Sequence, residues 1–174
     1  IQGAHFAFVG FTNLSQDHLD FHGDLESYFA AKAKLFTYDF ADQAVINIDS
    51  EYGARLAAST ELPVISLSRL STQATWHFAE IDASGKKVHL KIRGSGGILI
   101  ESSTKLRGGY NLDNLLMAVA IAVESGVDPI DALLLEPVKY IVEVVSSVIF
   151  VFAVLVDDDA VPLNVVAVIV FPDM

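Results

Sequence analysis

Apolar segments in the first part of the chain predict the strands of a parallel sheet. Residues 6–11 form a continuous apolar run, the mostly apolar residues 44–49 predict a second strand, and residues 64–67 predict a third, shorter one. Runs of this kind are typical of strands that are buried on both faces, because helices cover a parallel sheet from both sides. The pattern therefore predicts an α/β fold with helices flanking a mostly parallel sheet.

Segments with apolar residues every three or four positions predict the helices between these strands. The first predicted helix covers residues 25–36, with Asp24 as its N-cap. The second covers residues 51–59, with Asp49 or Ser50 as its N-cap. Each helix follows a strand along the chain, as expected for a β-α-β order.

The later part of the chain predicts an antiparallel meander and two further helices. One helix covers residues 112–124 and stops at Gly126, and Pro129 starts a short helix to about residue 135. Three β-rich segments with turn residues between them precede these helices, and they predict a small meander attached to the parallel sheet. These segments are residues 75–81, 87–92 and 98–101.

The chain changes character after Tyr140. From there to Met174 it contains no Gly, Lys or Arg, and Val dominates, so the segment predicts strands with breaks at residues 157–159 and Pro162. We expect a domain boundary near Pro137. It divides the chain into one domain over residues 1–136 and, over residues 137–174, either the start of a C-terminal domain or a strand-rich tail.

The amino-acid composition limits the kinds of molecule that the chain is expected to bind. With 11 Lys+Arg against 22 Asp+Glu the net charge is -11, which argues against nucleic-acid binding, because neutralising a phosphate backbone requires Lys and Arg. A nucleotide ligand stays possible, since a metal ion and backbone amides hold its phosphates. The chain has no Cys, which excludes disulfides and thiolate metal sites and is consistent with a cytoplasmic location.

The apolar character of the chain predicts a truncated sheet rather than a membrane span. No strictly apolar run is longer than nine residues, the length of residues 148–156, whereas a membrane helix needs about 20. Hydrophobic residues make up 52% of the chain, which opens on an apolar strand without an initiating Met. We expect a piece of a longer protein whose sheet has an open edge beside its first strand, which would favour self-association.

A polar cluster follows the first predicted strand, where open α/β sheets place their ligands. His18 and His22 are four residues apart, with Asp17 and Asp20 beside or between them. On a helix the two histidines would share a face and bind a metal ion. A solvated loop with capping aspartates explains the same residues without any chemistry.

Lys32 and Lys34 have opposite predicted environments although they are two positions apart. Helical periodicity places Lys32 next to Tyr28 and Phe29 on the apolar face, and it places Lys34 on the solvent face. Lys32 either extends its amine to the surface or is buried for a reason. A buried neutral amine is nucleophilic and reacts with carbon dioxide to give a carbamate, an oxygen ligand for Mg²⁺.

Asn111 and Asn114 stand near the start of the helix predicted over residues 112–124, after two glycines. Asn is a strong N-cap, so capping explains them without a ligand. Two carboxamides three residues apart could also bind the donor and acceptor edge of a purine.

Taken together, these segments resemble the central ATPase domain of the Mur ligases. The resemblance rests on residues 12–22 (TNLSQDHLDFH), on residues 28–36 (YFAAKAKLF), and on Asn47-Ile48-Asp49 with Glu51-Tyr52-Gly53. It continues through residues 106–114 and covers roughly residues 1–136 in unbroken order. The string Asp-His-Leu-Asp-Phe-His resembles most closely the type that adds the third peptide residue, the UDP-N-acetylmuramoyl-tripeptide synthetases.

The resemblance implies roles at the matching positions. His18 is implied to bind a metal ion, and Lys32 to carry a carbamate that helps to hold Mg²⁺. Asn111 and Asn114 are implied to contact the adenine of ATP. Asn13 and Asp17 lie in the motif around the metal ion and the phosphates.

The family's reaction implies the substrates. ATP phosphorylates the terminal carboxylate of UDP-N-acetylmuramoyl-L-alanyl-D-glutamate, and the amine of a diamino acid then displaces phosphate to form an amide of the peptidoglycan precursor. The sequence does not distinguish lysine, ornithine and diaminopimelate. Two alternatives remain: a ligase similar to folylpolyglutamate synthetase, and a non-catalytic nucleotide-binding module.

The chain departs from the family pattern in two places. No G-x-x-G-K-S/T phosphate loop occurs in it, so we expect the chain alone to be inactive. After Glu136, Lys139-Tyr140-Ile141 replaces the family's Pro-Gly-Arg element, and residues 157–160 lack the Tyr and His of its Asp-Tyr-Ala-His element.

Overall fold

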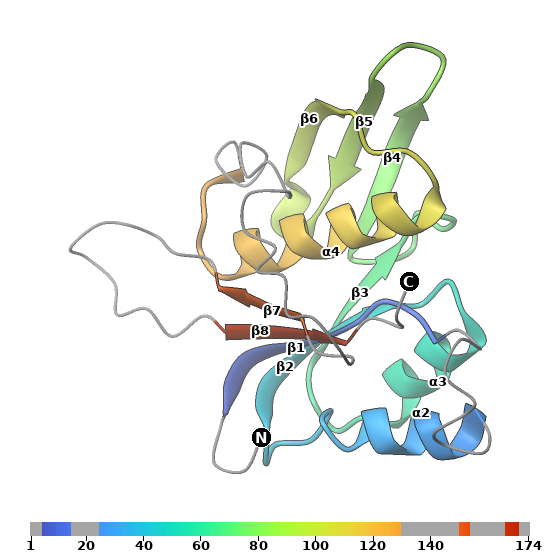
Figure 1. Cartoon of the computed structure of the whole chain (residues 1–174). Helices are drawn as coiled ribbons and strands as arrows, with labels where there is room; N and C mark the ends of the chain where they lie inside the picture. The colour runs from blue at the N-terminus through green and yellow to red at the C-terminus, as the bar shows by residue number, and fades with distance from the viewer. Residues whose placement is uncertain (1–4, 15–24, 130–149, 154–165, 171–174) are drawn as a thin grey trace.

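The computed structural model describes residues 5–14, 25–129, 150–153 and 166–170. Their strands form one eight-stranded sheet in the order β6-β5-β4-β3-β2-β1-β8-β7 (Figure 1). The sheet is parallel from β4 through β3, β2 and β1 to β8, and β5, β6 and β7 pair antiparallel with their neighbours. The predicted α/β architecture with a mostly parallel sheet is confirmed.

The centre of the sheet is formed by β1 (Phe6–Phe11), β2 (Ala41–Asn47) and β3 (Val64–Ser68). Phe11 pairs with Ile46, and Asn47 pairs with Leu67, so the carboxyl ends of the three strands lie at the same edge of the sheet. The last residues of β1 and β2 are buried, as their mostly apolar sequences predict.

The predicted meander is formed by β4 (Trp76–Asp82), β5 (Val88–Arg93) and β6 (Leu99–Thr104). Buried and more exposed residues alternate along β5, so one face of the meander packs inward and the other faces solvent. β4 also pairs parallel with β3 through Leu67 and Trp76, which makes the meander an extension of the main sheet. In Figure 1 it rises as the green and yellow-green strands above the rest of the molecule.

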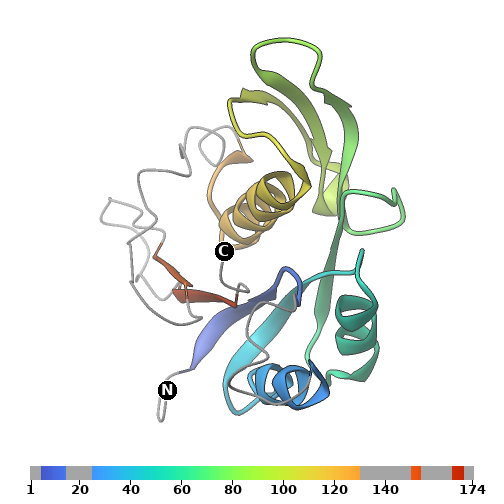
Figure 2. The ribbon, with the colours of Figure 1, turned by 45° about the vertical axis from the view of Figure 1, so that its right-hand side comes forward.

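Helices cover both faces of the sheet. α2 (Leu25–Ala33) and α3 (Glu51–Ser59) lie on one face, and α4 (Gly109–Glu124) crosses the other (Figures 1 and 2). Two separate clusters of buried side chains correspond to these two faces. The α4 side includes Val45, Leu67, Trp76, Ile92 and Leu116, and the opposite side includes Val9, Phe11, Phe29, Ile46 and Leu56.

The ends of the helices differ in part from the prediction. α2 ends at Ala33 rather than at residue 36. Leu35 N donates to Lys32 O at 3.1 Å, and Phe36 N donates to Ala33 O at 3.0 Å, so the chain tightens into turns that lead to β2. Ser50, one of the two predicted caps of α3, accepts a hydrogen bond from Gly53 N at 3.1 Å. The predicted cap Asp24 lies outside the described residues.

The last turn of α4 is fixed to the meander. Trp76 Nε1 donates to Glu124 Oε1 at 2.7 Å, and Ser95 Oγ donates to the same oxygen. Trp76 is fully buried, so this carboxylate satisfies an indole N–H that water does not reach. The contact holds the C-terminal end of α4 against β4.

The tail contributes two strands, β7 (Phe150–Ala153) and β8 (Val166–Val170). β8 pairs parallel with β1, from Phe8 with Ala167 to Phe11 with Val170. The expectation of an open edge beside the first strand is therefore wrong, because β8 supplies the hydrogen-bonding partner. The predicted boundary near Pro137 and the body of the helix predicted after Pro129 lie outside the described residues. Among the described helices, none is long and apolar enough to cross a membrane.

Candidate functional site

Polar side chains gather where the parallel strands end. Thr12 and Asn13 follow β1, Asp49 follows β2, and Ser68 ends β3. Because these strands are parallel and in register, the residues lie along one edge of the sheet. Ligands of open α/β sheets bind at this edge, so it is the candidate functional site.

Thr12 and Asn13 present buried oxygens at the end of β1. Thr12 is 3% exposed. Its Oγ1 and the Oδ1 of Asn13 are buried and have no hydrogen-bond partner within the part of the chain that the structure describes. A buried polar oxygen requires an explanation, because leaving it unpaired is costly. Both atoms are of the oxygen type that Mg²⁺ prefers.

Lys32 is buried in the last turn of α2, and Lys34 is exposed. Lys32 is 5% exposed, and its Nζ lies 4.4 Å from the centroid of the Tyr28 ring, which is itself buried. The predicted difference between the two lysines is confirmed. The amine thus lies over the face of the ring, the side of an aromatic ring that attracts a cation. The chemical role of Lys32 stays a prediction.

α2 is held against α3 by a cluster of side chains. Arg55 Nη1 lies 2.7 Å from Glu26 Oε2, and the Arg55 guanidinium carbon lies 4.7 Å from the centroid of the Phe29 ring. The Phe29 and Tyr52 ring centroids are 5.2 Å apart. Desolvation, and then the charge of Glu26, raise the pKa of Tyr52 above its ordinary value. These contacts fix the helix that carries Lys32.

Asp49 organises the turn that follows β3. Its Oδ1 accepts a hydrogen bond from Ser68 Oγ, and its Oδ2 accepts one from Arg69 N at 2.8 Å. Ser68 Oγ in turn accepts from Leu70 N at 3.1 Å and from Ser71 N at 2.7 Å. One carboxylate after β2 thus sets the backbone that leaves β3.

Arg69 connects this turn to the start of α4. Its Nε lies 2.9 Å from Asp113 Oδ1, with the two side chains 29% and 13% exposed. Burial raises the pKa of Asp113, the Arg69 guanidinium opposes that rise, and the charge of Asp49 adds to it. The ion pair is therefore partly buried, with a second carboxylate close enough to act on it.

Asn111 and Asn114 lie in the first two turns of α4. Asn111 is exposed, and its Nδ2 donates to Arg107 O at 2.7 Å, while Asn114 is half-buried. Neither is the N-cap, which is Gly108 with a φ of 87° and no side-chain cap bond. The capping interpretation is therefore wrong as an N-cap, although Asn111 does bind a carbonyl of the preceding turn.

The structure brings together only part of the predicted site. Asn111 and Asn114 lie on one helix, and Lys32 lies across the sheet from them on α2. His18 and Asp17 lie outside the described residues. Within the described residues no group of three or more His, Cys, Asp or Glu side chains is arranged to hold a metal ion. No sequence pattern indicated a part in the site for Asp49, Arg69 or Asp113, although Asp113 stands between the two asparagines in sequence.

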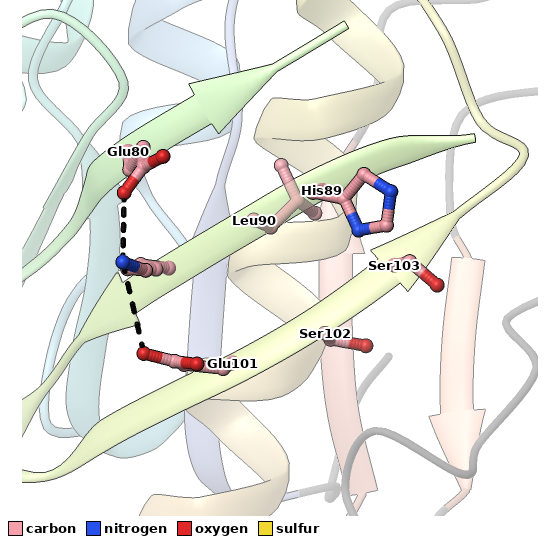
Figure 3. Close-up of a pocket in the computed structure, with 7 residues that line it drawn as sticks. Glu80, His89, Leu90, Glu101, Ser102 and Ser103 are labelled. Carbon is pink, nitrogen blue, oxygen red and sulfur yellow. Dashed lines mark ion pairs between the residues drawn. The ribbon is translucent and has the colours of Figure 1, made fainter. Parts of the chain in front are cut away.

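A shallow hollow of about 440 Å³ lies elsewhere, on the outer face of the meander (Figure 3). Lys91 Nζ lies 2.9 Å from Glu80 Oε2 and 3.8 Å from Glu101 Oε1. The hydrogen bond with Glu80 and the charges of both glutamates raise the pKa of Lys91. Lys91 on β5 thus forms ion pairs with one glutamate on each neighbouring strand. These solvent-facing ion pairs account for the charged residues of the hollow without a ligand.

Comparison with known proteins connects the fold to a family. Residues 1–122 match the model of the Mur ligase middle domain. The chain is 40% identical over 129 residues to the UDP-N-acetylmuramyl-tripeptide synthetase of Leifsonia xyli subsp. xyli, covering 74% of this chain and 25% of that relative. It is 36% identical over 125 residues to the UDP-N-acetylmuramoyl-L-alanyl-D-glutamate–2,6-diaminopimelate ligase of Streptomyces coelicolor, covering 71% and 25%.

A solved structure gives the same result. The structure of a UDP-N-acetylmuramoyl-L-alanyl-D-glutamate–2,6-diaminopimelate ligase superposes with a TM-score of 0.63 and 26% identity, covering 87% of this chain and 30% of that one. The chain spans about a quarter of the length of the curated relatives it matches.

Proposed function

The chain belongs to the Mur ligase family, and we propose that it forms much of the nucleotide and metal site of a ligase that adds the third amino acid to the peptidoglycan precursor. The proposed substrates of this ligase are ATP, UDP-N-acetylmuramoyl-L-alanyl-D-glutamate and a diamino acid. These substrates place the reaction in the cytoplasm. Family membership and the polar edge of the sheet support it.

The proposed reaction has two steps. The terminal carboxylate of the precursor takes the γ-phosphoryl group of ATP, which gives ADP and an acyl phosphate. The amine of the incoming amino acid then attacks the acyl carbon, the C–O bond to phosphate breaks, the amine loses a proton and phosphate leaves. Catalysis of this kind depends mainly on positioning and on neutralising charge.

The burial of Lys32 is the observation that carries the proposal. A lysine with no chemical role has little reason to be 5% exposed in the last turn of α2, when Lys34 just beyond the helix is exposed. We assign to Lys32 a carbamate that forms when its amine reacts with carbon dioxide and loses a proton. That reaction replaces a cation with an anionic oxygen ligand.

The donor atoms at the end of β1 fit a magnesium ion. The Oδ1 of Asn13 and the Oγ1 of Thr12 are buried oxygens, and a carbamate on Lys32 would add further oxygens. His18 and Asp17, which follow in the sequence, complete the proposed set. When bound, the ion would neutralise phosphate charge.

Asn111 and Asn114 are proposed to contact the adenine. They project from α4 on the opposite face of the sheet from Lys32, so a nucleotide that reaches both groups has to cross the carboxyl edge. The phosphates need a loop that this sequence does not contain, so the chain supplies only part of the ATP site.

The test uses the full-length protein that carries this chain, assayed for ATP-dependent joining of a diamino acid to the precursor. Lys32→Ala is expected to lower kcat by a factor of about 10³ or more, because charge stabilisation in phosphoryl transfer is worth that much. Lys34→Ala is the matched control and is expected to retain activity. Equal activity of both variants would remove the chemical role of Lys32.

The same assay distinguishes two alternative functions from the proposed one. A ligase similar to folylpolyglutamate synthetase would accept a different carboxylate, so it would turn over ATP with that substrate and not with the muramoyl dipeptide. A non-catalytic nucleotide-binding module would bind ATP and give no amide product with either.

A further inference from the structure

We propose that Asp49, Arg69 and Asp113 form a positioning chain that sets the place of Asn111 and Asn114 and thereby controls affinity and selectivity for the adenine nucleotide. This inference rests on the proposed function, because it takes the two asparagines as the adenine contacts. The three residues come from three different segments: the loop after β2, the turn after β3 and the start of α4.

The first link fixes the backbone of Arg69. Asp49 accepts from both Ser68 Oγ and Arg69 N, and Ser68 Oγ holds the next two backbone N–H groups. Ser68 is fully buried. The direction in which Arg69 leaves the strand is therefore determined by the carboxylate of Asp49.

The second link joins Arg69 to α4. The Arg69 Nε to Asp113 Oδ1 distance is 2.9 Å, and both side chains are more than two-thirds shielded from solvent. Arg69 also lies across the first residue of the helix, since a Cβ at Gly109 would stand 2.8 Å from Arg69 Nη2. The guanidinium thus contacts α4 at its start and one turn later.

The third link is the geometry of the helix. Asp113 stands two residues after Asn111 and one before Asn114, so all three belong to about one helical turn. A shift of Asp113 moves both carboxamides with it. Hydrogen-bond recognition of a purine edge tolerates errors of about 0.5 Å, so a small displacement of this turn weakens binding.

The two negative charges of Asp49 and Asp113 make the position of Asp113 depend on the cation of Arg69. Asp49 acts unfavourably on the ionised form of Asp113, whereas Arg69 favours that form. Without the guanidinium, Asp113 would be a mostly buried carboxylate facing a second one, and this turn of α4 would move to reach water. The far end of α4 would stay fixed by Trp76 and Ser95 through Glu124.

The experiment measures steady-state kinetics of the full-length ligase. Asp113→Asn keeps the shape of the side chain and loses its charge, and Arg69→Met removes the cation. Each is expected to raise the KM for ATP about tenfold, equal to roughly 1.4 kcal/mol. The KM for the muramoyl substrate should change less than about twofold, and the preference for ATP over GTP should fall. Arg69→Lys should lie between, because lysine keeps the charge but not the planar fork.

Two control variants separate positioning from general stability. Glu80→Gln removes an exposed ion pair of similar length on the meander and should leave all three measurements unchanged. Glu124→Ala loosens the other end of α4 and should lower the melting temperature without changing the ATP to GTP preference. The same loss of nucleotide preference in Glu124→Ala would overturn the inference, because any loosening of the helix would then suffice.

A further variant separates the inference from the proposed function. If Asn111→Ala leaves the KM for ATP unchanged, the adenine assignment fails and the inference fails with it. If Asn111→Ala raises the KM for ATP while Asp113→Asn and Arg69→Met do not, the adenine site stands and the positioning chain is overturned. Melting temperatures identify any variant that does not fold. If Arg69→Met does not fold, the near-isosteric Asp113→Asn decides whether the positioning chain stands.

Discussion

The Nζ of Lys32 lies 4.4 Å from the centroid of the Tyr28 ring, one helical turn earlier on α2. An aromatic face attracts an ammonium ion and repels an anion. The structure therefore shows the side chain in a place that suits the cation. Conversion to the proposed carbamate would require the end of the side chain to leave the ring, and Lys32 would then have two positions with opposite charge.

Chemical rescue is the first prediction. In the full-length ligase, a short carboxylic acid such as acetate or propionate should restore part of the activity of Lys32→Ala, because it supplies the anionic oxygen that the alanine lacks. The measurement is amide formation against acid concentration, with Lys34→Ala and the unmodified enzyme as controls. Failure of any carboxylate to raise the rate in Lys32→Ala alone would count against the carbamate.

The second prediction concerns the 174-residue chain on its own. It should show no ATP-dependent phosphate release, because it contains no G-x-x-G-K-S/T loop to hold the β and γ phosphates. The measurement is phosphate release by the purified chain at millimolar ATP and Mg²⁺. Release that persists through repeated purification and disappears in Lys32→Ala would show that the phosphate loop is dispensable.

Asp113 provides a prediction about pH. Burial holds its folded pKa above the ordinary value of 3.8, so the folded protein binds this proton more tightly than the unfolded chain does. The stability that follows is complete below pH 3.8 and is lost as the pH rises through the folded pKa. The free energy of unfolding of the chain, relative to that of Asp113→Asn, should fall as the pH rises above about 4.

Asp82 is the control for this titration. It is exposed, and hydrogen bonds from Ser84 lower its pKa, so its contribution has the opposite sign and is lost as the pH falls. In urea unfolding over the same pH range, the free energy of unfolding of the unmodified chain, relative to that of Asp82→Asn, should not fall as the pH rises. A flat difference for Asp113→Asn would mean that Arg69 compensates its burial completely.

The fourth prediction concerns the packing of α3 on β2. A Cβ at Gly53 would stand 1.9 Å from the carbonyl oxygen of Asn47, so Gly53→Ala has to push the helix away from the strand. Helix propensity alone would favour alanine by about 1 kcal/mol. The collision with a backbone atom is expected to outweigh this and to cost about 1–3 kcal/mol.

Gly85→Ala is the matched control for Gly53→Ala. A Cβ at Gly85 would meet only Lys87 O at 3.6 Å, an ordinary contact, so this variant should unfold at nearly the same temperature as the unmodified chain. Thermal unfolding of the two variants decides the question. If the Gly53→Ala chain is as stable as the Gly85→Ala chain, α3 can move away from β2 without a loss of stability.

Local pattern alone determined much of this molecule. Apolar segments predicted β1 and β2, alternation predicted the meander, and helical periodicity separated a buried Lys32 from an exposed Lys34. These features follow from the repeat of the backbone, which fixes the face of each side chain within a few residues. The family resemblance then supplied the roles of Lys32 and the two asparagines, which remain predictions.

Only the tertiary structure decided which distant segments meet. β8 lies beside β1 although about 155 residues separate them, and no local pattern specifies that pairing. Asp49, Arg69 and Asp113 are individually ordinary charged residues, and their connection depends on β2, β3 and α4 reaching the same edge of the sheet. Periodicity fixes the face on which a side chain lies but not its partner, because the partner is set by the packing of the whole chain.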